Sequence, residues 1–196
     1  MAIETASSSS AVDLFFCIAS QDSERAEMGV KCMERWSNEP GVRHIVLRPE
    51  DCQVSPEEFQ SVRRVVADMM GQSEFYILAD DDCLPQDEPF IEQALQIMRD
   101  NSDFGILSLF PANCAIQAWT PEDYEPRNTD DILEHHSVGG IRICRRGVIT
   151  EWPEQTGRGY DAEQCAAVRA AGYRVGYFKR FHMEHLGEGK TTVWQA

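Results

Sequence analysis

The chain has 196 residues, of which 42% are hydrophobic and 26% charged, and its formal net charge is −15. The hydrophobic and charged fractions are ordinary for a globular protein, and the length predicts one domain. The acidity argues against a protein that grips nucleic acid through a broad basic surface. It leaves room for anionic small ligands, because a bound metal can reverse the local charge.

The seven cysteines are widely spaced and form no C-x-x-C pair. This spacing argues against a zinc site or a disulfide framework and favours reduced thiols in a reducing compartment. No apolar run approaches the roughly 18 residues of a membrane span, and no signal peptide is visible. We therefore expect a cytoplasmic protein without membrane insertion, in which residues 1–11 form a disordered lead-in.

Apolar strands and amphipathic helices alternate through the first 110 residues. We predict strands at 12–19, 42–47, 75–79 and 104–110, helices at 22–36, 55–71 and 87–98, and a polar loop at 48–52. This alternation predicts an α/β fold with a mostly parallel central sheet flanked by helices and right-handed crossovers.

The pattern changes after Pro111. We predict a long irregular segment at 111–136, a strand at 137–144, a glycine-rich loop at 155–160, a helix at 161–171, a strand at 173–178 and a polar tail at 181–190. With no repeat or linker in view, residues 12–196 form one predicted domain, divided into halves at 12–110 and 111–196.

Three adjacent carboxylates, Asp80, Asp81 and Asp82, follow the apolar run that starts at Phe75. Open α/β sheets bind ligands beyond the carboxyl ends of their strands. Three neighbouring acids repel one another unless a cation or a hydroxyl-rich ligand takes up the charge. A divalent metal site that holds a phosphate-bearing ligand and an acidic solvated turn both fit these residues.

Three motifs in order resemble those of glycosyltransferases with the GT-A fold, in particular the inverting family-2 group. The first is the D-x-D motif at 80–82. The second is G-Y-D-A-E-Q at 159–164, followed by R-A-A-G-Y-R-V at 169–175. The third is a histidine before the glycine-rich end, His182 or His185. The resemblance covers roughly residues 12 to 190 and implies a single GT-A domain.

The resemblance implies a divalent cation, Mn²⁺ or Mg²⁺, that stabilises the departing diphosphate of a nucleotide-sugar. Asp82 would be the direct metal ligand, with Asp80 nearer the ribose and sugar and Asp81 in either role. His185 or His182 would complete the site, and an imidazole ligand favours manganese. A pair of exposed histidines is the competing interpretation.

The resemblance makes Asp161 the base that takes the proton of the acceptor hydroxyl. An ordinary helix N-cap is the competing interpretation of Asp161, and Glu163 is the substitute candidate for the base. Tyr160 replaces the glutamate usual in the family, which leaves the acceptor contacts open.

The resemblance also implies nucleotide and sugar contacts near the strand ends and on the helix before the acids. Candidate residues are Ser20 after the first strand, Asp51 or Glu50 after the second, Arg64 or Arg63 on the helix before the acids, Gly140 with Arg142, and Trp152. A helix-surface charge is the alternative for the arginines, and a core position is the alternative for Trp152.

Together with the resemblance, these residues predict a metal-dependent glycosyltransferase that uses a nucleotide-sugar donor, with a UDP-sugar favoured. That the enzyme inverts the anomeric configuration is implied by the resemblance alone. The acceptor is open among small glycosides, proteins and modified nucleic-acid bases, and so is the oligomeric state. One alternative is a nucleotidyltransferase of similar fold, although residues 19–24 lack the glycine-rich phosphate loop that it would need. Another alternative is a sugar-nucleotide- or cation-binding module without turnover.

Overall fold

The computed structural model describes residues 12–18, 27, 30–31, 41–87, 89–113, 125–152 and 160–186. Glu27, Val30 and Lys31 are helical, in line with the helix expected at 22–36, but the rest of that segment lies outside the described residues. The expected lead-in at 1–11, Ser20, positions 155–159 of the glycine-rich loop and positions 187–190 of the tail also lie outside them.

Within the described residues, eight strands form one sheet. They are β1 (Val12–Cys17), β2 (Val42–Leu47), β3 (Phe75–Asp80), β4 (Cys83–Pro85), β5 (Phe104–Pro111), β6 (Ile132–Glu134), β7 (Arg142–Arg145) and β8 (Arg174–His185). Their order is β2-β1-β3-β7-β5-β8-β4, and β6 pairs with β8 outside this path. Strands β2, β1, β3, β5 and β8 share one direction, whereas β7, β4 and β6 run the opposite way. The predicted α/β class with a mostly parallel sheet is confirmed.

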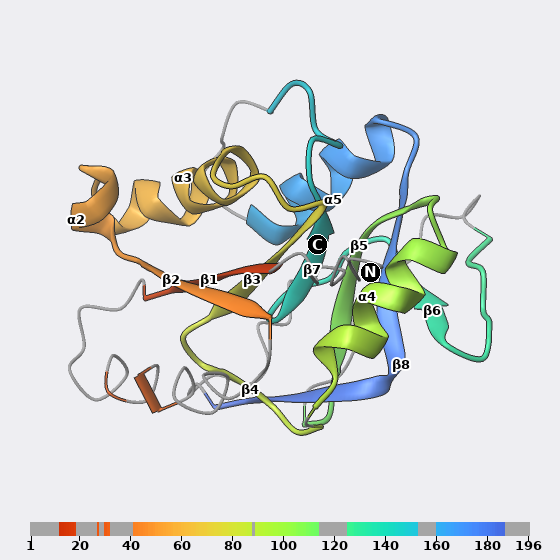
Figure 1. The fold of residues 1–196 in the computed structure, drawn as a ribbon. Coiled ribbons are helices and arrows are strands. Elements are labelled where there is room, and N and C mark those ends of the chain that lie inside the picture. The colour runs from red at the N-terminus through yellow and green to blue at the C-terminus, as the bar shows by residue number, and fades with distance from the viewer. Residues whose placement is uncertain are drawn as a thin grey trace, which may run out of the picture.

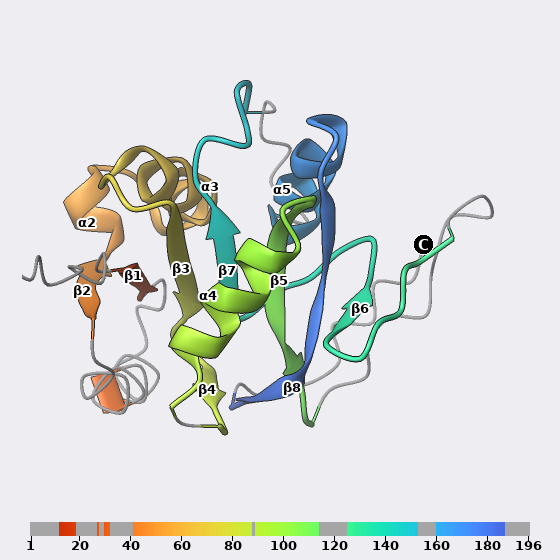
Figure 2. The ribbon, with the colours of Figure 1, turned by 45° about the vertical axis from the view of Figure 1, so that its right-hand side comes forward.

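Helices cover both faces of the sheet (Figures 1 and 2). Helix α4 (Ile91–Asp100) packs on one face, and α3 (Pro56–Met69) and α5 (Tyr160–Ala170) pack on the other. Successive side chains of a strand point to opposite faces of the sheet, so each strand contributes residues both to the core under α4 and to the core under α3 and α5. In β1, Leu14 joins the core under α4, while Phe15 joins the core under α3 and α5.

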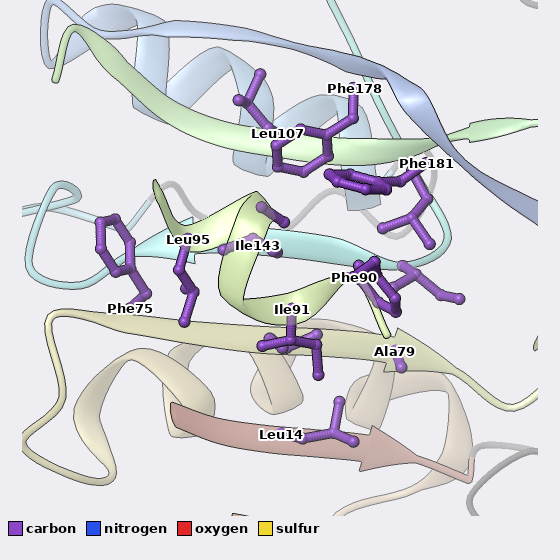
Figure 3. Close-up of a cluster of buried hydrophobic side chains, with 14 of the residues drawn as sticks. Leu14, Phe75, Ala79, Phe90, Ile91, Leu95, Leu107, Ile143, Phe178 and Phe181 are labelled. Carbon is purple, nitrogen blue, oxygen red and sulfur yellow. The ribbon is translucent and has the colours of Figure 1, made fainter. Parts of the chain in front are cut away.

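The core under α4 joins side chains from strands across the sheet (Figure 3). Leu14, Phe75, Leu107, Ile143 and Phe178 come from five different strands, and each is at most 2% exposed. α4 contributes Ile91 and Leu95, which lie between these strands and the solvent. This packing fixes the strand ends on which the candidate site depends.

Local signals start the helices of the first half. Ser55 accepts a hydrogen bond from the Glu58 amide at 3.2 Å, and the Glu58 carboxylate accepts one from the Ser55 amide at 2.9 Å. This capping box, with Pro56 at the first helical position, starts α3 where the sequence predicted a helix. The short α2 (Pro49–Cys52) lies in the segment 48–52, so the predicted polar loop there is wrong.

Several predicted boundaries need correction. The helix expected at 87–98 begins only at Ile91, so the described residues 87, 89 and 90 are not part of it. The segment 111–136 contains strand β6, and the strand expected at 137–144 is confined to 142–145. The last strand reaches His185 rather than residue 178, so positions 181–185 are strand and not a polar tail.

The sequence pattern did not show that the strands β4, β6 and β7 are antiparallel to their neighbours. β7 lies between β3 and β5 and runs opposite to both, and β4 pairs with the end of β8. β4 has three residues, and an element this short gives no periodic signal. No helix within the described residues is long and apolar enough to cross a membrane.

Leu107→Ala tests the core under α4. Leu107 is fully buried, so we expect the free energy of unfolding to fall by about 2–5 kcal/mol, through lost burial and the cavity left behind. The control Met69→Ala, whose side chain is 77% exposed at the end of α3, should change it by less than about 0.5 kcal/mol. Urea unfolding of both variants measures the difference, and equal losses would contradict this account of the core.

Candidate functional site

The acidic stretch after β3 lies at the edge of the sheet where the parallel strands end. Asp80 is the last residue of β3 and pairs in register with Cys17, the last residue of β1. β7 runs the opposite way, so its first residue, Arg142, lies near this edge and pairs with Leu78 of β3. The structure therefore brings Asp80 and Arg142 together from segments far apart in the sequence.

Two arginines surround the Asp80 carboxylate. Arg63 Nη1, from α3, donates to Asp80 Oδ1 at 2.5 Å, and Arg142 Nη2 lies 3.8 Å from the same oxygen. Burial opposes the charge of Asp80, but Arg63 and Arg142 outweigh it and lower the pKa of Asp80 below its ordinary value. Asp80 is therefore an ionised acceptor that is already held by two guanidinium groups.

The same Arg142 guanidinium also binds Asp161 at the start of α5. Arg142 Nη1 donates to Asp161 Oδ1, and it also approaches Gln164 Oε1 at 3.3 Å. Burial lowers the pKa of Arg142, but Asp161 and Asp80 more than compensate and raise it above its ordinary value. One fully buried cation thus bridges the carboxylate predicted on the donor side and the carboxylate predicted as the base.

Two glycines let the backbone pass close to Asp161 and β8. A Cβ at Gly139 would lie 2.7 Å from Asp161 Oδ2. A Cβ at Gly140, whose φ is +74°, would lie 2.6 Å from the side chain of Met183. Side chains at these two positions would displace the groups around them. The glycine pair therefore supports the shape of the site.

The remaining predicted nucleotide and sugar residues lie in different surroundings. Arg64 is buried beside this cluster, where burial lowers its pKa to about 10 against the opposing effect of Asp161. Asp51 is exposed on α2, and its carboxylate accepts a hydrogen bond from the Arg48 amide at 3.0 Å. Trp152 is half-buried and packs against the core under α3 and α5.

A second group of side chains forms where β4 pairs with β8. Asp82, Cys83 and His185 each offer one ligand atom, and these atoms lie within 4.8 Å of one another. His185 Nε2 lies 3.2 Å from Asp82 Oδ2, and the Cys83 thiol lies 3.7 Å from Asp82 Oδ1. Burial, with the charges of Asp80 and Asp82, raises the pKa of this thiol. The neighbouring acids therefore have different partners: Asp80 lies beside the arginines, whereas Asp82 lies beside His185.

The two histidines of β8 have different partners. The backbone amide of His182 donates to Asp87 Oδ2 at 2.6 Å, and its ring Nδ1 lies 3.1 Å from the same oxygen. His185, three residues later, is the histidine beside Asp82. Asp81, between Asp80 and Asp82 in the sequence, is buried and only 3% exposed.

The group of Asp82, Cys83 and His185 fits a divalent cation by the chemistry of its donor atoms. Carboxylate oxygen and imidazole nitrogen are common ligands for such ions. Cys83 is a member of this group that no sequence motif identifies. It directly follows the acidic triplet, but only the β4–β8 pairing shows that it meets a histidine.

Comparisons with known proteins support the fold. No family model matches the chain, and no curated protein matches it by sequence. Among solved structures, GalNAc-T7 with UDP, GalNAc and Mn²⁺ is similar with a TM-score of 0.55 and 13% identity, over 90% of this chain and 37% of that one. A mutant of Drosophila β1,4-galactosyltransferase 7 with manganese, UDP-Gal and xylobiose gives a TM-score of 0.50 and 18% identity, over 91% and 72%.

S. aureus TarS is similar with a TM-score of 0.51 and 12% identity, over 88% of this chain and 60% of that one. At these identities the comparisons establish the architecture alone. The chain has the GT-A-like fold of these glycosyltransferase structures, with a central mostly parallel sheet and flanking helices.

Arg142→Met tests the buried ionic bridge. Without the guanidinium, two partly buried carboxylates lose their shared partner, so we expect a loss of about 3–5 kcal/mol in the free energy of unfolding. In the control Arg180→Met, the side chain is 61% exposed and pairs with Asp131, so the loss should stay under about 1 kcal/mol. Similar losses in the two variants, measured by urea unfolding, would contradict the bridging role.

The lowered pKa of Asp80 predicts an acid dependence of stability. A group with a folded pKa below its unfolded value of about 3.9 stabilises the protein above that pH, and this contribution is lost as the pH falls through the folded pKa. We therefore expect Asp80→Asn to flatten the decline in the free energy of unfolding below about pH 4. Unfolding curves across this acidic range measure it, and a slope equal to that of the parent chain would refute it.

Proposed function

We propose that the protein is a metal-dependent inverting glycosyltransferase that moves a sugar from a nucleotide-diphospho-sugar, with a UDP-sugar the favoured donor, to an acceptor hydroxyl. One observation carries the proposal: Asp161 on α5 and Asp80 at the end of β3 share the buried Arg142 at the ligand edge of the sheet. The fold and the three ordered motifs support the same function.

Asp161 is the proposed base. Arg142 binds its Oδ1 atom, which leaves Oδ2, beside the backbone of Gly139, as the oxygen that would accept the acceptor's proton. The Asp161 side chain is 34% exposed, so this carboxylate is within reach of solvent-borne ligands even though its partner is fully buried. Because Asp161 is at the start of α5 and is bound to the buried Arg142, its carboxylate can adopt few orientations.

Asp82 and His185 are the proposed metal ligands. A divalent cation held there would act as a Lewis acid that stabilises the negative charge of the leaving nucleoside diphosphate. Asp80 and Arg64 would contact the donor's ribose, sugar or phosphates from the adjoining cluster, with Ser20, Asp81, Asp51, Gly140 and Trp152 as further proposed contacts. In this arrangement the donor lies across the end of β3, and the acceptor approaches from the side of α5.

The ligands in the similar solved structures suggest which donor to test first. UDP or UDP-Gal is bound with manganese in two of them. UDP-sugars and Mn²⁺ are therefore the first conditions to test, with Mg²⁺ as the second metal. The same assay can screen small glycosides, proteins and modified nucleic-acid bases as acceptors.

Asp161→Asn tests the proposed base. Loss of the general base should lower the rate of sugar transfer, or of donor hydrolysis, by at least about 100-fold in the presence of Mn²⁺. The measurement follows release of nucleoside diphosphate from a panel of nucleotide-sugars, with and without a chelator. Glu92→Gln, an exposed acid of α4 outside the site, serves as the matched control and should keep the parent rate.

The other outcomes each have a meaning. Full activity in Asp161→Asn with a 100-fold loss in Glu163→Gln would move the base to Glu163. Binding of donor and metal without release of nucleoside diphosphate would identify a binding module. Turnover of nucleoside triphosphates in place of nucleotide-sugars would identify a nucleotidyltransferase. Retention of the anomeric configuration in the product, observed by NMR, would contradict inversion.

A further inference from the structure

The β4–β8 pair brings three different kinds of ligand atom to one point. Cys83, the first residue of β4, is the direct partner of His185, the last residue of β8, and Asp82 immediately precedes Cys83. Directly opposed residues in an antiparallel pair point to the same face of the sheet. The result is a carboxylate oxygen, a thiol sulfur and an imidazole nitrogen within 4.8 Å of one another.

Backbone contacts hold this group in place. The Leu186 amide donates to the Asp82 carbonyl at 2.7 Å, and the Gln86 amide donates to the His182 carbonyl at 2.9 Å, so the strands are tied on both sides of the group. Asn113 binds both the amide and the carbonyl of His185 at 2.9 Å. Fixed backbones favour a preorganised set of ligands, because little ordering is left to occur on binding.

The Cys83 sulfur lies at the inner side of the group. Cys83 is fully buried, and a Cβ built at Gly140 would lie 3.2 Å from its sulfur, so the glycine backbone closes that side. The His185 side chain is 35% exposed and forms the outer side. A cation can therefore approach from the side of His185 and reach the oxygen, the nitrogen and the sulfur.

We propose that Cys83 is a metal ligand in its thiolate form, together with Asp82 and His185, and that the site prefers a borderline ion such as Zn²⁺ or Co²⁺ over the hard ion Mg²⁺. Soft sulfur ligands select such ions, whereas all-oxygen sites suit Mg²⁺. Metal binding displaces the thiol proton to solvent, so each bound ion forms one metal–sulfur bond. The wide cysteine spacing gave no sign of this site because its other ligands are not cysteines.

This inference rests on the metal site of the proposed function but not on sugar transfer. X-ray absorption of the full chain loaded with one equivalent of Zn²⁺ tests it directly. We expect one sulfur in the coordination shell at about 2.3 Å, together with oxygen and nitrogen ligands. A shell of oxygen and nitrogen alone in the parent chain overturns the proposal without any variant.

Variants assign the sulfur to a residue. Cys83→Ser should remove the sulfur from the zinc shell, abolish the sulfur-to-cobalt charge-transfer band of the Co²⁺ form, and weaken Zn²⁺ by at least about 10-fold while changing Mg²⁺ affinity less. The matched control Cys52→Ser removes a half-buried thiol on α2 and should change none of these. Circular dichroism confirms that each variant is folded, and Cys83→Ala replaces the serine variant if that one unfolds.

The results separate this inference from the proposed function. Loss of the sulfur signal in Cys52→Ser, or its persistence in Cys83→Ser, overturns the assignment to Cys83. Sulfur coordination by Cys83 without release of nucleoside diphosphate from any donor supports the metal site and refutes the transferase. Mn²⁺-dependent turnover with an oxygen and nitrogen shell supports the transferase and refutes the thiolate ligand.

Discussion

The candidate site depends on one buried cation, Arg142, that lies between two carboxylates. A buried guanidinium is costly unless charges and hydrogen bonds compensate it. Asp161 and Asp80 supply that compensation, one from the start of α5 and the other from the end of β3. Arg63 adds a second positive charge at Asp80. Because each of these ions needs its neighbours, the cluster joins α3, β3, β7 and α5 at one edge of the sheet.

The direction of β7 explains why this cluster can form. β1 and β3 end at the ligand edge, whereas the antiparallel β7 begins there with Arg142 and the preceding glycine pair. β8 runs parallel to β5, so its far end carries His185 back to the same region, beside Asp82. A sheet with only parallel strands would place the start of β7 at the opposite edge, far from Asp80.

Local patterns in the sequence predicted much of this architecture. The strand at 42–47, the capping box of Ser55 and Glu58, and the apolar run before Asp80 depend on near neighbours, so they are visible in the chain itself. The reversed direction of β7 and the pairing of β4 with β8 depend on distant partners and left no such mark. The extension of β8 did leave one, since buried Phe181 and Met183 alternate with polar residues, but the glycines that follow obscured it.

The candidate site also has predictable and unpredictable parts. Sequence motifs identified Asp161, Asp80 and Asp82. The bridge through Arg142 and the contact between Cys83 and His185 depend on the three-dimensional fold and could not be predicted from the sequence. The most direct test of the account is a crystal structure with UDP and Mn²⁺ bound. We predict that the metal contacts Asp82, His185 and the diphosphate. We also predict that Asp161 lies on the side of the diphosphate where the sugar and the acceptor would bind. A nucleotide bound away from the end of β3, or a metal that contacts neither Asp82 nor His185, would contradict it.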